Sequence, residues 1–209
     1  MKKIALLSFV FASLWSCKNE EKKETVEDTT AITEVAVGDL TVVEDSTKVS
    51  WTGFKTTDKV GVTGTFTKLK LENLQAGNTP EEILEGARTK MTTASLSSNN
   101  EVRDGKLKNI FFGAMRDTEL IDVIFNFRTE KLFTTITMNG VTKEVEASYT
   151  VADNVLKLKT EITISDFGAQ AALDKIHEAC YDLHKGADGV SKTWDTVDVT
   201  GEVHFMASK

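Results

Sequence analysis

The sequence predicts a mainly β protein, an antiparallel eight-stranded barrel with a few short helices, for three reasons. From residue 40 onward, apolar and polar residues alternate with a period of two, which is typical of strands with one buried face. Asn139-Gly140 lies between two such stretches and indicates a tight hairpin, because both residues accept positive φ. The chain has one proline, which suits long strands that need all their N–H groups for pairing.

Eight stretches are expected to be strands. They are residues 48–55, 60–72 and 91–97, Ile121 to Phe127, the run before Asn139, Val145 to Val151, Leu156 to Ile164, and Val197 to Phe205. The alternation fails at Lys68, so a bulge or strand end is expected between Phe66 and Leu69. A closed barrel is the simplest arrangement because it leaves no exposed edge, although a two-sheet sandwich would give the same alternation.

Three helices are expected between these strands. Thr79-Pro80-Glu81-Glu82 combines an N-cap, a first-turn proline and two acidic residues, which predicts a helix over 80–87. A second helix should cover 100–110 and project Leu107, Ile110 and Phe111. The third should fill the gap before the last strand, over 169–185, and end at Gly186.

The N-terminal residues predict export and lipidation. Lys2 and Lys3 precede an apolar stretch, Ile4 to Trp15, that is shorter than the roughly 20 residues needed to span a bilayer, as in a signal peptide. The stretch ends in Leu14-Trp15-Ser16-Cys17, which resembles the bacterial lipoprotein cleavage box. We therefore expect a signal peptide over 1–16 and an acylated Cys17; the alternative is an ordinary secretory signal with an incidental cysteine.

Residues 17–38 are expected to be a tether between the acylated cysteine and the barrel domain of 39–209. The segment 18–34 is charged and Thr-rich with few apolar residues, which is typical of disorder. Its first residues, Lys18-Asn19-Glu20-Glu21, resemble the acidic export tag of some Bacteroidetes lipoproteins. The expected location is outside the cytoplasm, on the outer membrane facing the periplasm, with display on the cell surface as the alternative.

Charge and cysteine content exclude some classes of function. Acidic side chains number 32 against 25 basic ones, for a net charge of −7. This balance argues against binding nucleic acid or anionic lipid headgroups by overall charge, because both require a basic patch. With Cys17 acylated, Cys180 is the one remaining thiol, so no intramolecular disulfide is expected.

The barrel interior is the candidate binding site. Eight strands enclose a space that side chains can fill or that can hold one small ligand. Small residues are expected to point inward at Gly53, Gly64, Ala147, Thr160 and Gly201. The volume they leave would be lined by the apolar or aromatic side chains of Trp51, Phe66, Phe125, Tyr149 and Phe205. Alternatively, the glycines mark corners where strands bend.

Four short motifs in order carry a family resemblance. They are Gly64-x-Phe66; Asn99-Asn100-Glu101-Val102-Arg103-Asp104 followed by Leu107 and Phe111-Phe112; Gly140-Val141-Thr142; and Ser165-Asp166-Phe167-Gly168. Together they cover about residues 45–206 and resemble YceI-like proteins. The resemblance implies an extended, lipocalin-like barrel that binds polyisoprenoid or related long-chain lipids, usually outside the cytoplasm, with no catalytic residues and no cofactor.

The expected ligand-binding residues follow from the barrel interior and this resemblance. Phe111 and Phe112 join the five aromatic residues named above, and Arg103 and Asp104 are expected to supply polar groups at the cavity mouth. An Arg-Asp pair in a helix is more often a structural or solvated feature. The chain departs from the family in its lipidation and in a longer final connection with its own helix, which leaves open where the cavity mouth lies.

Two competing functions remain at this stage. His177, Cys180 and His184 have helical spacing and could bind zinc or copper, although Leu173 and Ile176 extend the same face as a core stripe would. The other alternative is a surface-exposed interaction lipoprotein with a solidly packed barrel. No G-x-S-x-G, phosphate-binding glycine loop or H-E-x-x-H motif is present, so no enzymatic activity is expected.

Overall fold

The computed structural model describes residues 39–208 of the chain. The predicted signal peptide of 1–16, the acylated Cys17 and the tether of 17–38 lie outside the described residues. Within residues 39–208, no helix has both the length and the apolar character needed to cross a membrane.

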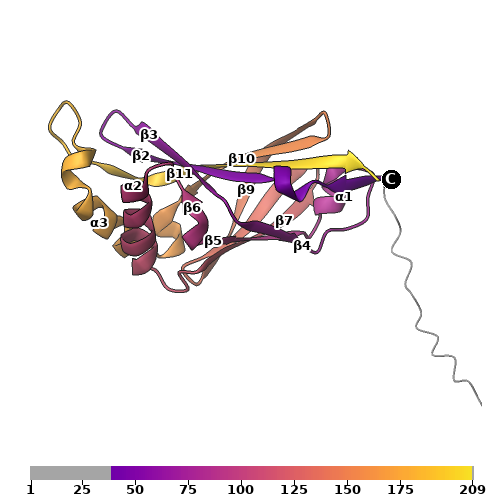
Figure 1. Ribbon diagram of the computed structural model, residues 1–209, viewed down its shortest axis with the longest axis horizontal. Helices are drawn as coiled ribbons and strands as arrows, with labels where there is room; N and C mark the ends of the chain where they lie inside the picture. The colour runs from indigo at the N-terminus through magenta and orange to yellow at the C-terminus, as the bar shows by residue number, and fades with distance from the viewer. Residues whose placement is uncertain (1–38, 209) are drawn as a thin grey trace, which may run out of the picture. The chain divides into compact units, whose positions relative to one another are not determined.

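The described residues form a mainly antiparallel β structure, as the alternation predicts. Its strands are β1 (Leu40–Val42), β2 (Lys48–Lys55), β3 (Val60–Phe66), β4 (Leu69–Glu72), β5 (Arg88–Thr92), β6 (Leu96–Ser97), β7 (Leu120–Arg128), β8 (Lys131–Met138), β9 (Val141–Ala152), β10 (Val155–Thr163) and β11 (Thr193–Ala207). They pair in the order β4-β5-β7-β8-β9-β10-β11-β2-β3-β6, with β1 beside β11 (Figure 1). The single curled sheet excludes a sandwich of two separate sheets.

The described part of the chain has eleven strands rather than eight because two expected strands are interrupted and a short β1 is added. β3 ends at Phe66 and β4 begins at Leu69, which confirms the predicted strand end. β5 and β6 are separated by a 3-10 turn, Thr93–Ser95. The Thr67 N–H donates to the Ser95 carbonyl across the two breaks, at 3.1 Å. β3 also pairs with β2, and β4 pairs with β5. Backbone hydrogen bonds therefore connect neighbouring strands all the way around the barrel, as a lipocalin-like fold requires.

The three predicted helices are present among the described residues but differ in length. α1 (Pro80–Leu84) starts with the expected capping box at Thr79 and stops before Gly86, whose φ is +71°. α2 (Glu101–Lys106) continues into a π-helical turn (Leu107–Phe111) and a 3-10 turn (Phe112–Ala114). α3 (Gln170–Ala179) is followed by a separate 3-10 turn (Tyr181–His184), so the single helix predicted over 169–185 is broken at Cys180.

Two of the sequence motifs meet at the predicted hairpin. Asn139 and Gly140 have φ of +55° and +72°, as a tight two-residue turn requires. The Asn139 side chain accepts a hydrogen bond from the Arg116 N–H at 2.6 Å and donates one to the Phe167 carbonyl at 2.8 Å. The hairpin is thereby joined to the 3-10 turn Ile164–Phe167, which contains the Ser-Asp-Phe-Gly motif.

The interior contains two core clusters at opposite ends of the sheet. α2 and α3 lie at one end, here called the cap end, and α1 lies at the other, called the α1 end (Figure 1). The cluster at the cap end includes Phe112, Phe167 and Ile176. The cluster at the α1 end includes Leu84 and Leu132, both completely buried.

Candidate functional site

A cavity of about 440 Å³ lies inside the cap end of the barrel. Its wall combines inward-facing residues of β2, β3, β7, β8, β10 and β11 with side chains of α2, the π-helical turn and α3. A smaller cavity of about 50 Å³ lies beside it and shares five of its residues, namely Val49, Met91, Val123, Ile136 and Val199. The larger volume falls in the range of about 300–1,000 Å³ typical of small-ligand sites.

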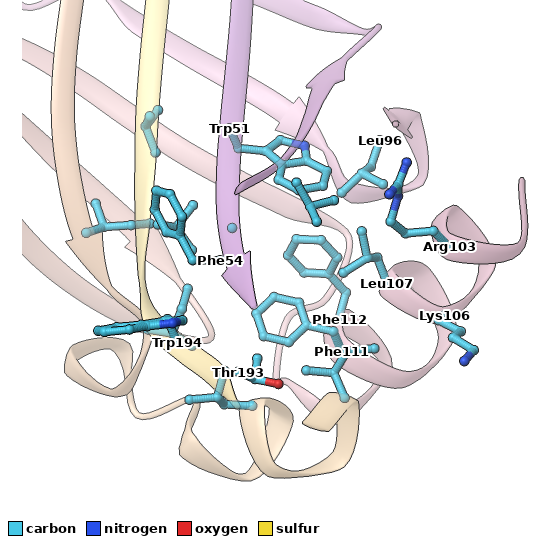
Figure 2. Close-up of a pocket in the computed structure, with 18 of the residues that line it drawn as sticks. Trp51, Phe54, Leu96, Arg103, Lys106, Leu107, Phe111, Phe112, Thr193 and Trp194 are labelled. Carbon is cyan, nitrogen blue, oxygen red and sulfur yellow. The ribbon is translucent and has the colours of Figure 1, made fainter. Parts of the chain in front are cut away.

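The π-helical turn positions three apolar side chains over the cavity. The Phe112 N–H donates to the Leu107 carbonyl, five residues back, so these two residues lie on the same face of the turn. The rings of Phe111 and Phe112 pack edge to face with their centroids 5.0 Å apart. Figure 2 shows Leu107, Phe111 and Phe112 gathered with Trp51 around the same space.

The inward-facing glycines differ in what fills the space beside them. At Gly53 a Cβ atom would meet nothing within 4 Å, and this residue lines the larger cavity. At Gly64 the Trp51 ring already occupies the space, and at Gly201 the Leu158 side chain does. Only Gly53 of these three therefore contributes open volume; the other two permit close packing.

The predicted small residues Ala147 and Thr160 contribute little to the larger cavity. Ala147 is buried in the core cluster at the α1 end. Thr160 lines only the smaller cavity, and its hydroxyl donates to the Glu146 carbonyl at 2.9 Å.

The predicted aromatic residues fall into two groups. Those that line the larger cavity are Trp51, Phe66, Phe111 and Phe112. Phe125 reaches only the smaller cavity, while Tyr149 and Phe205 line neither cavity and belong to the core at the α1 end. Tyr149 packs there edge to face against Phe127, with centroids 5.4 Å apart. Alternation indicates the face on which a side chain lies, not its depth in the barrel, so these residues face inward but meet packed core.

Arg103 and Asp104 have different surroundings although they are neighbours in the sequence. Arg103 lines the cavity, and its Nε donates to Ser98 Oγ at 2.7 Å. Asp104 does not line it; its Oδ1 accepts hydrogen bonds from the Ser98 N–H at 2.9 Å and the Ser98 hydroxyl at 2.5 Å. Asn100 caps α2 by accepting from the Arg103 N–H at 2.9 Å. The motif therefore fixes the entry to the helix and holds the Arg103 guanidinium at the cavity edge.

The structure adds cavity residues that the alternation does not predict. Phe54 and Trp194 line the cavity although they lie outside the inward-facing positions (Figure 2), and Lys55, which continues the register of Val49, Trp51 and Gly53, lines it as well. The pairing of β11 with β2 is irregular between Thr193 and Val197, and β11 starts four residues before the expected Val197. An irregular register turns successive side chains to new directions, which strict alternation cannot show. The sequence signal that was available is the cluster Lys192-Thr193-Trp194, which lies between the expected third helix and the expected last strand.

Two histidines meet at one threonine beside the cavity. His177 Nδ1 and His184 Nδ1 lie 3.0 and 2.6 Å from Thr193 Oγ1. The hydroxyl can donate to only one imidazole, so the other must donate to it. Burial, together with the nearby positive charges of Lys55, His177 and Lys106, lowers the pKa of His184 to about 4. His184 is therefore a neutral imidazole near neutral pH.

The third residue of the proposed metal set has a different environment. Cys180 is buried, and its Sγ lies 3.8 Å from Lys106 Nζ. The positive charge of this lysine disfavours the binding of a metal cation at the same sulfur. Within residues 39–208, no group of three or more His, Cys, Asp and Glu side chains is close enough to hold a metal ion. His177 and His184 meet at Thr193, but the helix is broken at Cys180 and the three residues do not form a ligand set.

Comparison with solved structures shows the same fold at low sequence identity. A polyisoprenoid binding domain from Saccharophagus degradans superposes with a TM-score of 0.60 at 12% identity, covering 81% of this chain and 99% of that one. BcnA of Burkholderia cenocepacia gives a TM-score of 0.54 at 14% identity, covering 79% of this chain and 99% of that one. At the sequence level, none of the curated proteins matches the chain.

The family of the chain is shown by its sequence profile. The model of the YceI-like domain matches residues 40–205, which include every described strand except the last residues of β11. This range contains the four motifs, the barrel, and both the strand residues and the helical residues that line the cavity. The chain therefore belongs to the YceI-like family.

Proposed function

We propose that the protein binds one long-chain hydrophobic ligand, a polyisoprenoid or related lipid, inside the cap end of its barrel. The observation that carries the proposal is the cavity of about 440 Å³, whose wall is formed largely by aliphatic and aromatic side chains. Burial of each CH₂ group contributes about 0.8 kcal/mol, so a chain of several isoprene units would bind without specific polar contacts. The similarity to a polyisoprenoid binding domain supports the same class of ligand.

The binding is proposed to be non-catalytic. Polar side chains of the cavity wall also form structural hydrogen bonds, such as Arg103 with Ser98 and His184 with Thr193. These contacts hold the wall in place and leave the apolar volume as the main feature presented to a ligand. The protein would therefore store, shield or carry the lipid unchanged.

Mass spectrometry of an organic extract tests this function. The domain of residues 35–209 contains both core clusters and every strand, so it can be purified without the predicted anchor. We expect a long-chain lipid in about equimolar amount in the extract. A Gly53→Leu variant, which adds a side chain inside the cavity, should carry less lipid when prepared in parallel. A folded wild-type domain that carries no lipid and takes none up when candidate lipids are offered would contradict the proposal.

The protein is further proposed to be a lipoprotein of the outer membrane, anchored through Cys17 and facing the periplasm or the cell surface. Support comes from the signal-like residues 1–16 and the cleavage-box resemblance at Leu14-Trp15-Ser16-Cys17. Metabolic labelling with a fatty acid tests the anchor: the wild type should be labelled, and Cys17→Ser should not. Protease treatment of intact cells then distinguishes the surface from the periplasm.

The interaction-lipoprotein alternative requires a solidly packed barrel. Such packing occurs at the α1 end, but the open volume beside Gly53 at the cap end favours ligand binding. The metal alternative has no arrangement of His177, Cys180 and His184 in its favour, as described above.

A further inference from the structure

Three cationic side chains lie at the cavity edge in an otherwise acidic protein. Lys55, Arg103 and Lys106 line the cavity, and no Asp or Glu side chain does. They come from separate elements, β2 and α2, that are brought together only in the folded barrel. Figure 2 shows Arg103 and Lys106 on α2, with their charged ends directed away from the rings of Phe111 and Phe112. The cations thus mark the rim and the rings mark the interior.

These three cations form no ion pair of the kind that many other basic residues form. Lys59, Lys70, Lys90, Lys131, Lys157 and Lys159 each lie within 4 Å of a carboxylate. Within residues 39–208, no such ion pair is found for Lys55, Arg103 or Lys106. Lys55 and Lys106 therefore have no paired carboxylate although acidic residues outnumber basic ones in the chain, while Arg103 shares the Ser98 hydroxyl with Asp104.

Backbone carbonyls of the segment 179–183 hold both lysines in place. Lys55 Nζ donates to the Leu183 carbonyl at 3.1 Å, and Lys106 Nζ donates to the Ala179 carbonyl at 2.9 Å. An ammonium group has three hydrogens, so each lysine keeps donors for a further partner. Both lysines contribute to the lowered pKa of the nearby His184, which indicates that their positive potentials overlap at this side of the cavity.

We propose that the rim formed by Lys55, Arg103 and Lys106 binds an anionic headgroup, a phosphate or a carboxylate, on the lipid whose chain fills the cavity. This inference rests on the proposed lipid-binding function and adds the polarity and charge of the ligand. It also revises the expectation from net charge: the total is negative, but the fold gathers a local basic cluster that composition cannot reveal.

Three ligands with one chain and different heads test the proposal. Geranylgeranyl monophosphate, geranylgeranoic acid and geranylgeraniol are titrated into the domain of residues 35–209 at low ionic strength. Tryptophan fluorescence is a direct readout, because Trp51 and Trp194 both line the cavity. We expect at least about tenfold tighter binding of an anionic ligand than of the alcohol, since charge-assisted hydrogen bonds are about twice as strong as neutral ones. A stronger preference for the phosphate than for the acid would identify the phosphate as the head.

Charge-neutral variants locate the effect. Lys55→Gln and Lys106→Gln should each weaken binding of the anionic ligands, and the double variant, which keeps Arg103, should remove most of the preference by weakening the anions far more than geranylgeraniol. Lys157→Gln is the matched control, because it removes the same charge from an exposed strand position on β10, outside the cavity. If the double variant does not fold, a salt titration of the wild type replaces it: added salt should weaken the anion preference but not alcohol binding.

The outcomes separate this inference from the proposed function. Equal binding of the alcohol and the anions, or an anion preference that is undiminished in the double variant, overturns the headgroup proposal and leaves lipid binding intact. Failure of all three ligands to bind the folded domain overturns both.

Discussion

The Trp51 indole lies against the backbone of Gly64, so closely that a Cβ at residue 64 would stand 2.6 Å from Trp51 Cε2. The same Cβ would stand 2.7 Å from the Ser97 carbonyl on β6. Gly64 thus permits the close packing of β2, β3 and β6 that places the Trp51 ring in the cavity wall. The indole Nε1 is buried there without a hydrogen-bond partner among residues 39–208.

Gly64→Ala should destabilise the protein by about 1–3 kcal/mol, because overpacking forces neighbouring groups apart. Thermal unfolding followed by circular dichroism measures the change. Gly105→Ala is the control: its Cβ would meet nothing within 4 Å, and alanine in the interior of α2 should stabilise by about 0.5–1 kcal/mol. Unchanged stability of Gly64→Ala would show that Trp51 can move away at no cost.

Gly53→Leu should weaken lipid binding by about tenfold or more while leaving the melting temperature nearly unchanged. The added side chain enters open volume in the cavity, so it competes with the ligand without striking the protein. Binding of a prenyl alcohol, measured by tryptophan fluorescence, checks the effect. Thr63→Leu adds apolar bulk at an exposed position of β3 and should bind as the wild type does. Wild-type affinity in Gly53→Leu would mean that the lipid lies elsewhere.

His184 should make the stability of the domain depend on pH. Its pKa is about 4 in the folded protein, below the ordinary value of 6.5, because burial and nearby cations disfavour the charged form. The unfolded chain therefore binds the proton more readily, and stability is lost as the pH falls from about 6.5 towards 4. Melting temperatures measured between pH 7.5 and 4.5 should fall less steeply in His184→Gln.

His204→Gln is the control for this pH dependence, because it removes an imidazole that lies outside the cavity beside Glu202. It should retain the wild-type slope. A His184→Gln variant with the same slope as the wild type would show that other groups account for the acid sensitivity.

Asp195 should contribute more to stability than Asp198, three residues further along β11. Asp195 accepts hydrogen bonds from the Ser165 N–H at 2.9 Å and the Ser165 hydroxyl at 2.5 Å, which ties the Ser-Asp-Phe-Gly motif to the sheet. Asp198 forms an ion pair with Lys159 at 3.4 Å near the surface. Asp195→Ala should cost about 1–2 kcal/mol and Asp198→Ala less than about 0.5 kcal/mol in chemical denaturation. Equal effects would contradict a structural role for the motif serine.

Local patterns were sufficient for most of the strands and turns. The alternation of Leu156 and Leu158 with lysines predicts β10, and Asn139-Gly140 predicts the hairpin, because neighbouring residues decide both features. The break after Phe66 was also predictable, since the alternation fails at Lys68. The breaks within 88–97 and at Cys180 were not, because they depend on contacts with distant segments.

The sequence by itself determined the family, the antiparallel barrel and the inward face of each long strand, since these follow from motifs and from alternation within a few residues. Only the tertiary structure decided which inward-facing residues meet open volume. Gly53 opens a cavity and Gly64 receives the Trp51 ring, while Tyr149 and Phe205 lie in packed core at the α1 end. The basic rim was decided in the same way, because Lys55 and Arg103 come to line one cavity only through folding. A one-dimensional pattern contains neither the depth of a side chain in the barrel nor the distance between segments that are far apart in the chain.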